Sequence, residues 1–89
     1  MKAIVTVVGV DRVGIIGEIC TTLASLQINI VDISQTVMQN YFTMIMMVDT
    51  STSNCTLDEI NETLRRKEQE MGLSIRLQRE DIFQAMHRI

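Results

Sequence analysis

Three of the four glycines in the chain are concentrated in one stretch, GVDRVGIIG, which spans residues 9–17. Because glycine lacks a Cβ, a loop of this kind can approach a ligand closely. The start of a following helix offers unpaired N–H groups to a carboxylate or a phosphate. The same glycines also suit a steric role, in a tight turn and in close packing of helix on strand. The sequence leaves both roles open.

Two well-known phosphate-binding loops do not match this stretch. Gly9 and Gly14 have the glycine spacing of a Walker A loop, but Ile15 and Ile16 stand where that loop needs Lys and Ser or Thr. The dinucleotide-binding pattern fails as well, because Arg12 occupies the position two before Gly14. We therefore expect no nucleotide site.

Three polar residues in and near the loop have two interpretations each. Arg12 is either an exposed loop charge or a partner for an anionic group or a neighbouring subunit. Asp11 suits the cap of the following helix better than acid–base chemistry. Asn29 suits a turn with left-handed backbone geometry, and contact of its amide with a ligand is the less favoured alternative.

No grouping of side chains points to catalysis, a metal or a cofactor. The single histidine, His87, lies near the end of the chain, far in sequence from any candidate nucleophile. Cys20 and Cys55 have neither CxxC spacing nor a companion histidine, so we expect reduced thiols and not a metal site or a disulfide. The sequence predicts a protein that is not an enzyme.

Length and charge restrict the class of protein further. The chain has 89 residues, 46% of them hydrophobic, and a formal net charge of -3, which suits one small domain over residues 1–89. No apolar run approaches the ~18 residues of a membrane span, and no signal peptide is apparent. Charges of both signs are scattered along the chain, which argues against nucleic acid and anionic membranes as partners. We expect a cytoplasmic protein.

Hydrophobic periodicity predicts a strand over residues 3–10, followed by a helix. Next comes a pair of strands over 28–38 and 41–48, joined by a turn at 39–40. A second helix and a last strand, over 73–78, complete the predicted order. Thr56 and Glu59 form a capping-box pattern at the start of the second helix, and Gly72 marks its end. The apolar face of the first helix is predicted to contain Ile16, Ile19, Cys20, Leu23 and Leu26, with Thr22 on the polar face. That of the second is predicted to contain Leu57, Ile60, Leu64 and Met71.

The order β-α-β-β-α-β predicts an α+β fold of the ferredoxin-like type, an antiparallel sheet with two helices on one face and the first and third strands in the centre. A short amphipathic helix is expected in the tail, over residues 80–89. Both alternating sets of the third strand are apolar, so we expect it to be buried on both faces, with its second face against another copy of the chain. This predicts a homodimer or a higher homo-oligomer.

The segment VVGVDRVGIIGEI, followed by INIVDI in the same element order, resembles the ACT domain, a regulatory module that senses amino acids. The family's loop has Asp, Arg, Pro and Gly before the first helix, and here Val13 stands in place of the proline. The whole chain is most similar to small free-standing bacterial proteins with a single ACT domain. By position, the resemblance implies a ligand site formed by Asp11, Arg12, Val13, Gly14, Ile15 and Asn29.

The resemblance implies a small regulatory module that senses an amino acid or a similar metabolite at a dimer interface and acts through a partner protein. The main alternative is an oligomerisation or interaction module that binds no ligand. An acylphosphatase-like enzyme is a weaker alternative, because Arg12 and Asn29 match that family without its loop sequence. An RNA-binding module is disfavoured, because the adjacent residues Tyr41 and Phe42 point to opposite faces of the sheet.

Overall fold

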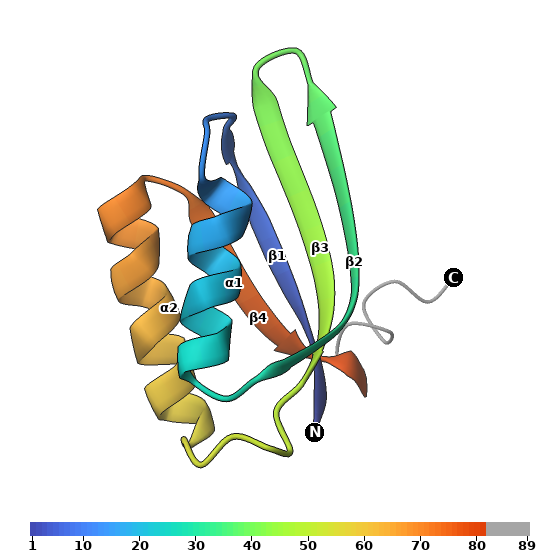
Figure 1. The fold of residues 1–89 in the computed structure, drawn as a ribbon, viewed down its shortest axis with the longest axis vertical. Helices are drawn as coiled ribbons and strands as arrows, with labels where there is room; N and C mark the ends of the chain where they lie inside the picture. The colour runs from blue at the N-terminus through green and yellow to red at the C-terminus, as the bar shows by residue number, and fades with distance from the viewer. Residues whose placement is uncertain (82–89) are drawn as a thin grey trace.

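The computed structural model describes residues 1–81, and its elements follow the predicted order (Figure 1). They are β1 (Lys2–Val10), α1 (Ile15–Ser25), β2 (Asn29–Met38), β3 (Tyr41–Asp49), α2 (Leu57–Met71) and β4 (Ser74–Arg79). The four strands form one antiparallel sheet in the order β2-β3-β1-β4. The prediction that the first and third strands lie centrally is therefore confirmed.

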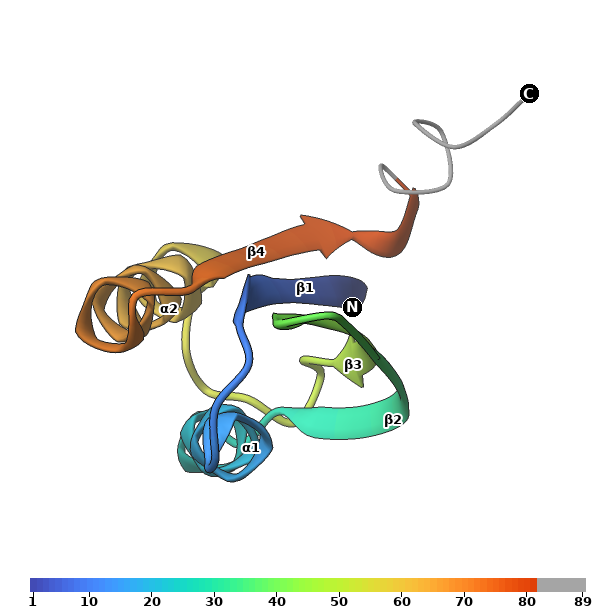
Figure 2. The same ribbon diagram turned by 90° about the horizontal axis from the view of Figure 1, so that it is seen from above.

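Both helices cover the same face of a strongly twisted sheet, α1 on the side of β2 and α2 on the side of β4 (Figure 2). This two-layer arrangement is the predicted ferredoxin-like α+β fold. The opposite face of the sheet, which we call the open face, carries no helix within residues 1–81.

The short C-terminal helix is not confirmed. Of the expected range 80–89, residues 82–89 lie outside the described residues, and the second helix of the fold is α2, in the middle of the chain.

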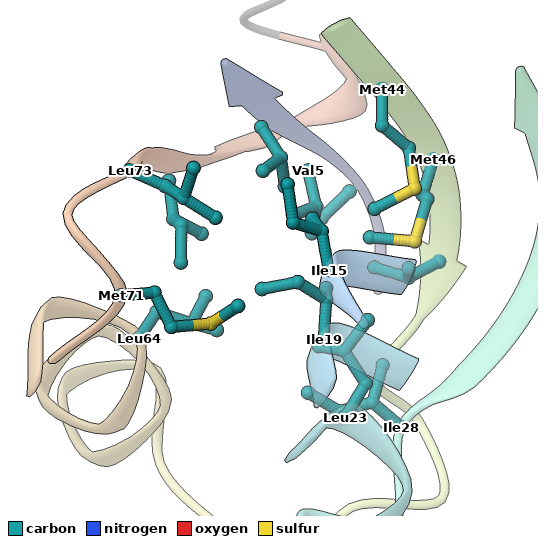
Figure 3. Packing of buried hydrophobic residues seen from close by; sticks show 14 of the residues in the cluster. Val5, Ile15, Ile19, Leu23, Ile28, Met44, Met46, Leu64, Met71 and Leu73 are labelled. Carbon is teal, nitrogen blue, oxygen red and sulfur yellow. The ribbon is translucent and has the colours of Figure 1, made fainter. Parts of the chain in front are cut away.

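The core fills the space between the sheet and the two helices (Figure 3). β1 and β3 contribute every second side chain to it, as the alternation of a half-buried strand requires. The largest fully buried side chains are Ile15, Ile19, Leu23, Met44, Met46, Ile60, Val5, Val7 and Val48.

The second helix begins and ends where the sequence predicts. The Thr56 hydroxyl accepts a hydrogen bond from the Glu59 amide at 3.2 Å, and the Glu59 carboxylate accepts one from the Thr56 amide at 3.0 Å. Gly72 ends the helix in the left-handed conformation, with φ at 68°. Ile60, Leu64 and Met71 are buried as predicted, whereas Leu57 is exposed, because it lies in the first turn of the helix.

The buried face of α1 is displaced by about one residue from the predicted one. Ile15 and Thr22 are buried, while Ile16 is exposed. Thr22 tolerates burial because its hydroxyl donates a hydrogen bond to the Glu18 carbonyl at 2.8 Å. The Asp11 cap is also wrong: Gly14 occupies the cap position, and no side chain caps α1.

Within the single chain the third strand is buried on one face only, and the predicted burial of its other face against a second copy stays a prediction. Phe42, Met44, Met46 and Val48 face the helices and are buried. On the open face Tyr41 is 59% and Ile45 is 43% exposed, because no second layer within residues 1–81 packs over them.

Among residues 1–81, no helix is both long enough and apolar enough to cross a membrane.

Candidate functional site

An open pocket of about 380 Å³ lies where the loop between β1 and α1 meets the C-terminal end of α2. Three of the predicted site residues, Arg12, Val13 and Gly14, line it. The remaining lining residues are Glu18, Glu70 and Met71, from the two helices. The pocket therefore combines the glycine loop with a part of the chain that is almost sixty positions away in sequence, as the separation of Arg12 and Met71 shows.

The backbone at Gly14 gives this pocket an uncapped helix end. Gly14 has φ at 95° and ψ at -3°, a left-handed conformation that residues with a Cβ rarely adopt. An ideal Cβ at this position would meet no atom within 4 Å, so the glycine serves the backbone conformation and not close packing. Since no side chain accepts from the first N–H groups of α1, these donors remain available to a ligand.

Arg12 connects the loop to α2. Its Nη2 donates a hydrogen bond of 2.7 Å to the main-chain carbonyl of Met71, in the last turn of α2. The last carbonyls of a helix have no partner inside it, and the last turn of α2 contains no basic residue of its own. Arg12 therefore supplies a positive charge to the end of α2 and fixes the loop beside it.

Glu18 and Glu70 are pocket residues that the sequence analysis missed. Glu18 lies in the first turn of α1, and Glu70 lies near the end of α2, where it also pairs with Lys67 at 3.7 Å. Their proximity depends on how the two helices pack, which single-sequence patterns do not show. The one available signal was that α2 ends at Gly72 without a basic residue, so its carbonyls needed a donor from elsewhere.

Two other predicted site residues lie beside the pocket without lining it. The Ile15 side chain is only 2% exposed and packs in the core, so this residue can face a ligand only through its backbone. The Asp11 amide donates a hydrogen bond of 2.8 Å to the Asn40 carbonyl, which attaches the start of the loop to the β2–β3 turn.

Asn29 is not brought to the loop within one chain. It is the first residue of β2 and pairs with Asp49, which in turn pairs with Lys2. The glycine loop follows Val10, at the other end of β1. The left-handed turn predicted for Asn29 occurs instead at Gln27, with φ at 59°, two residues earlier. The six predicted residues thus lie at two opposite ends of the sheet.

The other two glycines of the stretch have different roles. Gly9 belongs to β1, and a Cβ there would overlap the Leu73 side chain, so this glycine allows close packing. Gly17 lies in α1 with open space beside it and an ordinary backbone. The steric role therefore applies to Gly9, and the turn role applies to Gly14.

Within residues 1–81, no group of three or more His, Cys, Asp or Glu side chains is arranged to hold a metal ion. Cys20 and Cys55 are free and half-buried.

Comparison with known proteins identifies the family. A family model for the ACT domain matches residues 2–78. A UPF0237 protein from Clostridium acetobutylicum is 51% identical over 89 residues, which is 100% of both chains. The solved structure of an ACT domain protein from Streptococcus pneumoniae is 38% identical, with a TM-score of 0.82 over 93% of both chains.

The regulatory subunit of aspartate kinase from Thermus thermophilus is similar in fold alone, at 24% identity and a TM-score of 0.67 over 86% of this chain and 50% of that one. ACT domains are regulatory modules that bind small ligands. On its matched residues, its full-length relative and its fold, the chain belongs to the ACT domain family.

Proposed function

We propose that this chain is a single regulatory domain over residues 1–89 that binds an amino acid or a similar small metabolite in the pocket at the glycine loop. It works in the cytoplasm as a homo-oligomer, without catalysis of its own, and acts on a partner protein. The observation that carries the proposal is the pocket itself, which joins the left-handed Gly14, the uncapped start of α1 and the Arg12 guanidinium.

The pocket offers groups of both signs, as a zwitterion requires. The N–H groups at the start of α1 and the guanidinium of Arg12 suit a carboxylate. The carboxylates of Glu18 and Glu70 suit an ammonium group. A volume of about 380 Å³ is sufficient for a small metabolite.

Thermal unfolding with each standard amino acid at millimolar concentration tests the proposal. A ligand at about 100 times its dissociation constant adds about 2.7 kcal/mol to the free energy of unfolding. Each kcal/mol raises the melting temperature of so small a domain by about 4–8 °C. We expect one amino acid, or a small group of them, to raise it clearly.

Two matched variants locate the binding site. Val13 is fully exposed in the pocket wall, and Leu57 is exposed at the start of α2, outside the pocket. Val13→Glu adds a negative charge beside the expected carboxylate and should abolish the ligand-induced rise. Leu57→Glu makes the same change elsewhere and should preserve it. A rise that survives Val13→Glu would show that the ligand binds at another place.

A ligand-free interaction module is the second candidate, and a specific observation favours it. Val8, Val10, Tyr41 and Ile45 form an exposed apolar group on the open face, which suits contact with another protein. If no amino acid or related metabolite raises the melting temperature, this second function takes precedence.

A further inference from the structure

The outer edge of β4 carries main-chain groups that can pair with another strand. Among residues 1–81, β4 is the last strand of the sheet and pairs only with β1 (Figure 2). The Ile75 amide donates a hydrogen bond of 2.7 Å to the Glu68 carboxylate of α2, so it points away from β1. Because main-chain groups alternate in direction along an antiparallel strand, Leu77 and Arg79 also turn their N–H and C=O groups outward. We call Ile75, Leu77 and Arg79 the β4 edge.

A groove of about 340 Å³ lies beside the β4 edge, between this strand and α2. Strand β4 contributes Ile75, Arg76 and Leu77 to its lining, and the contribution of α2 includes Arg65 and Glu68. Ile75 is buried and Leu77 is half-buried, so the groove presents mainly polar side chains beside the main chain of β4. An extended chain in this groove would lie next to the outward main-chain groups.

The groove is positively charged, although the whole chain has a formal net charge of -3. Arg65 and Arg76 face a single carboxylate there, that of Glu68. The Arg65 side chain is 66% exposed, and its ion pair with Glu62 is 3.6 Å long between two exposed groups, which makes it weak. The Arg76 side chain is exposed and makes no hydrogen bond or ion pair within residues 1–81. Both guanidinium groups are therefore available to carboxylates of another molecule.

We propose that the β4 edge binds an extended acidic segment of a partner protein, which adds to the sheet as a further strand. Main-chain hydrogen bonds hold the segment, and Arg65 and Arg76 select carboxylates on it. A second β4 strand is a poor occupant, because antiparallel pairing would bring arginines of the two copies close together. The proposal rests on the proposed function only for the existence of a regulated partner protein, and it names the surface and the chemistry of that contact.

Glu68 controls access to this edge. Its carboxylate oxygen occupies the place of the carbonyl that an added strand would direct at the Ile75 amide. The same carboxylate puts a negative charge beside the two arginines of the groove. An acidic segment must therefore displace Glu68 to pair along the whole β4 edge, and removal of this side chain should strengthen binding.

Titration with short synthetic peptides, followed through backbone amide signals by NMR, tests the proposal. The probe is a peptide of alternating valine and glutamate with both ends blocked, and at millimolar concentration it should shift the amides of Leu77 and Arg79 in a saturable manner. A peptide of alternating valine and lysine should bind at least about tenfold more weakly. The glutamate peptide methylated on every peptide nitrogen cannot donate to the carbonyls of β4 and should not bind. No saturable shift at the β4 edge with the glutamate peptide, or equal binding of either control, would overturn the proposal.

Matched charge reversals locate the binding surface. Arg76→Glu reverses an exposed charge in the groove and should weaken binding of the glutamate peptide at least about tenfold. Arg66→Glu makes the same change at an exposed position of α2 outside the groove and should leave the affinity unchanged. Equal affinities of the two variants would contradict the assignment to the groove.

Two variants of Glu68 test the access to the edge. Glu68→Gln removes the charge but keeps an acceptor for the Ile75 amide, whereas Glu68→Ala removes both. Glu68→Ala should bind the glutamate peptide at least about threefold more tightly than Glu68→Gln, because the amide is then free to pair. Equal binding of the two variants would contradict pairing at Ile75. The amino-acid melting experiment uses another pocket and another ligand, so either proposal can fail without the other.

Discussion

The two halves of the chain share the order strand, helix, strand, yet their helices begin in opposite ways. Helix α2 starts with a complete capping box between Thr56 and Glu59. Helix α1 starts at the left-handed Gly14 with no side-chain cap, and a pocket opens beside it. A missing cap costs stability, typically about 1 kcal/mol, so its absence at α1 suggests that the N–H groups there serve another purpose.

The outer strands of the two halves also differ, because β4 has a residue buried in the core and β2 has none. Strand β4 directs Ile75 into the core, and it presents arginines at its edge, Arg76 and Arg79, which discourage uncontrolled strand pairing. Strand β2 has no buried position along its length, and its apolar residues Ile33 and Val37 are exposed although they lie on the helix side. The outer strand of the second half is thus partly packed into the core, while the first half leaves its outer strand and the start of its helix exposed.

Truncating one apolar residue in each outer strand should give the largest difference in the free energy of unfolding between the two halves. Ile75→Ala leaves a cavity in the core and should lower the free energy of unfolding by about 2–5 kcal/mol. Ile33→Ala removes a side chain that is 42% exposed and should cost less than about 1 kcal/mol. Urea unfolding of both variants measures the difference. Equal losses would show that β2 is as firmly packed as β4.

The two glycines at the start of α1 should respond in opposite directions to alanine. Gly14→Ala forces a Cβ into a left-handed conformation and should cost about 1–2 kcal/mol. Gly17→Ala places a methyl group in open space within a helix and should add about 0.5–1 kcal/mol. Thermal melts of the two variants check the signs. A stabilising Gly14→Ala would contradict the strained backbone at the pocket.

Removing the cap of α2 should make the second half resemble the first. Thr56→Ala deletes the hydroxyl that accepts from the Glu59 amide and should cost about 0.5–2 kcal/mol. Thr56→Ser retains an acceptor and serves as the control. If Thr56→Ala melts at the same temperature as the wild type, the capping box contributes nothing to stability. The presence of a cap on α2 and its absence on α1 would then make no difference to the stability of the two helices.

The capping box should also add a small dependence on pH. Hydrogen bonds from Thr56, above all from its backbone amide, hold the pKa of Glu59 below its ordinary value of 4.5. A lowered pKa stabilises the folded state fully above pH 4.5, and this contribution disappears as the pH falls through the folded-state pKa. Glu59→Gln removes this charge. The gap in urea midpoint between wild type and Glu59→Gln should therefore narrow on acidification, and a constant gap would contradict this explanation.

Most of the fold was predictable because local signals agree with the tertiary structure. Thr56, Glu59 and Gly72 delimit α2 by chemistry within a few residues of each end. The face of α1 was predicted less well, because Ile15, Ile16, Ile19, Cys20 and Leu23 form two overlapping apolar stripes. Packing against the sheet selects the stripe that contains Ile15 and Thr22, and the local pattern does not contain that information.

The candidate site was predictable only in its loop. The cluster of glycines pointed to the loop, and the family resemblance named Arg12, Val13 and Gly14 in it, which do line one pocket. Glu70 and Met71 reach that pocket from the far end of α2, through a long-range contact that no local pattern records. Asn29 was grouped with the loop by family position, whereas one chain holds it at the opposite end of the sheet.

The central claim, that the uncapped start of α1 binds an amino acid, is tested most directly by following backbone amide signals by NMR during titration with each standard amino acid. The account predicts that one of them shifts the amides of Val13, Gly14 and Ile15 in a saturable manner, while the amides of Glu59 and Ile60 in the capped helix remain in place. Saturable shifts confined to other regions, or no shift with any amino acid, would contradict it.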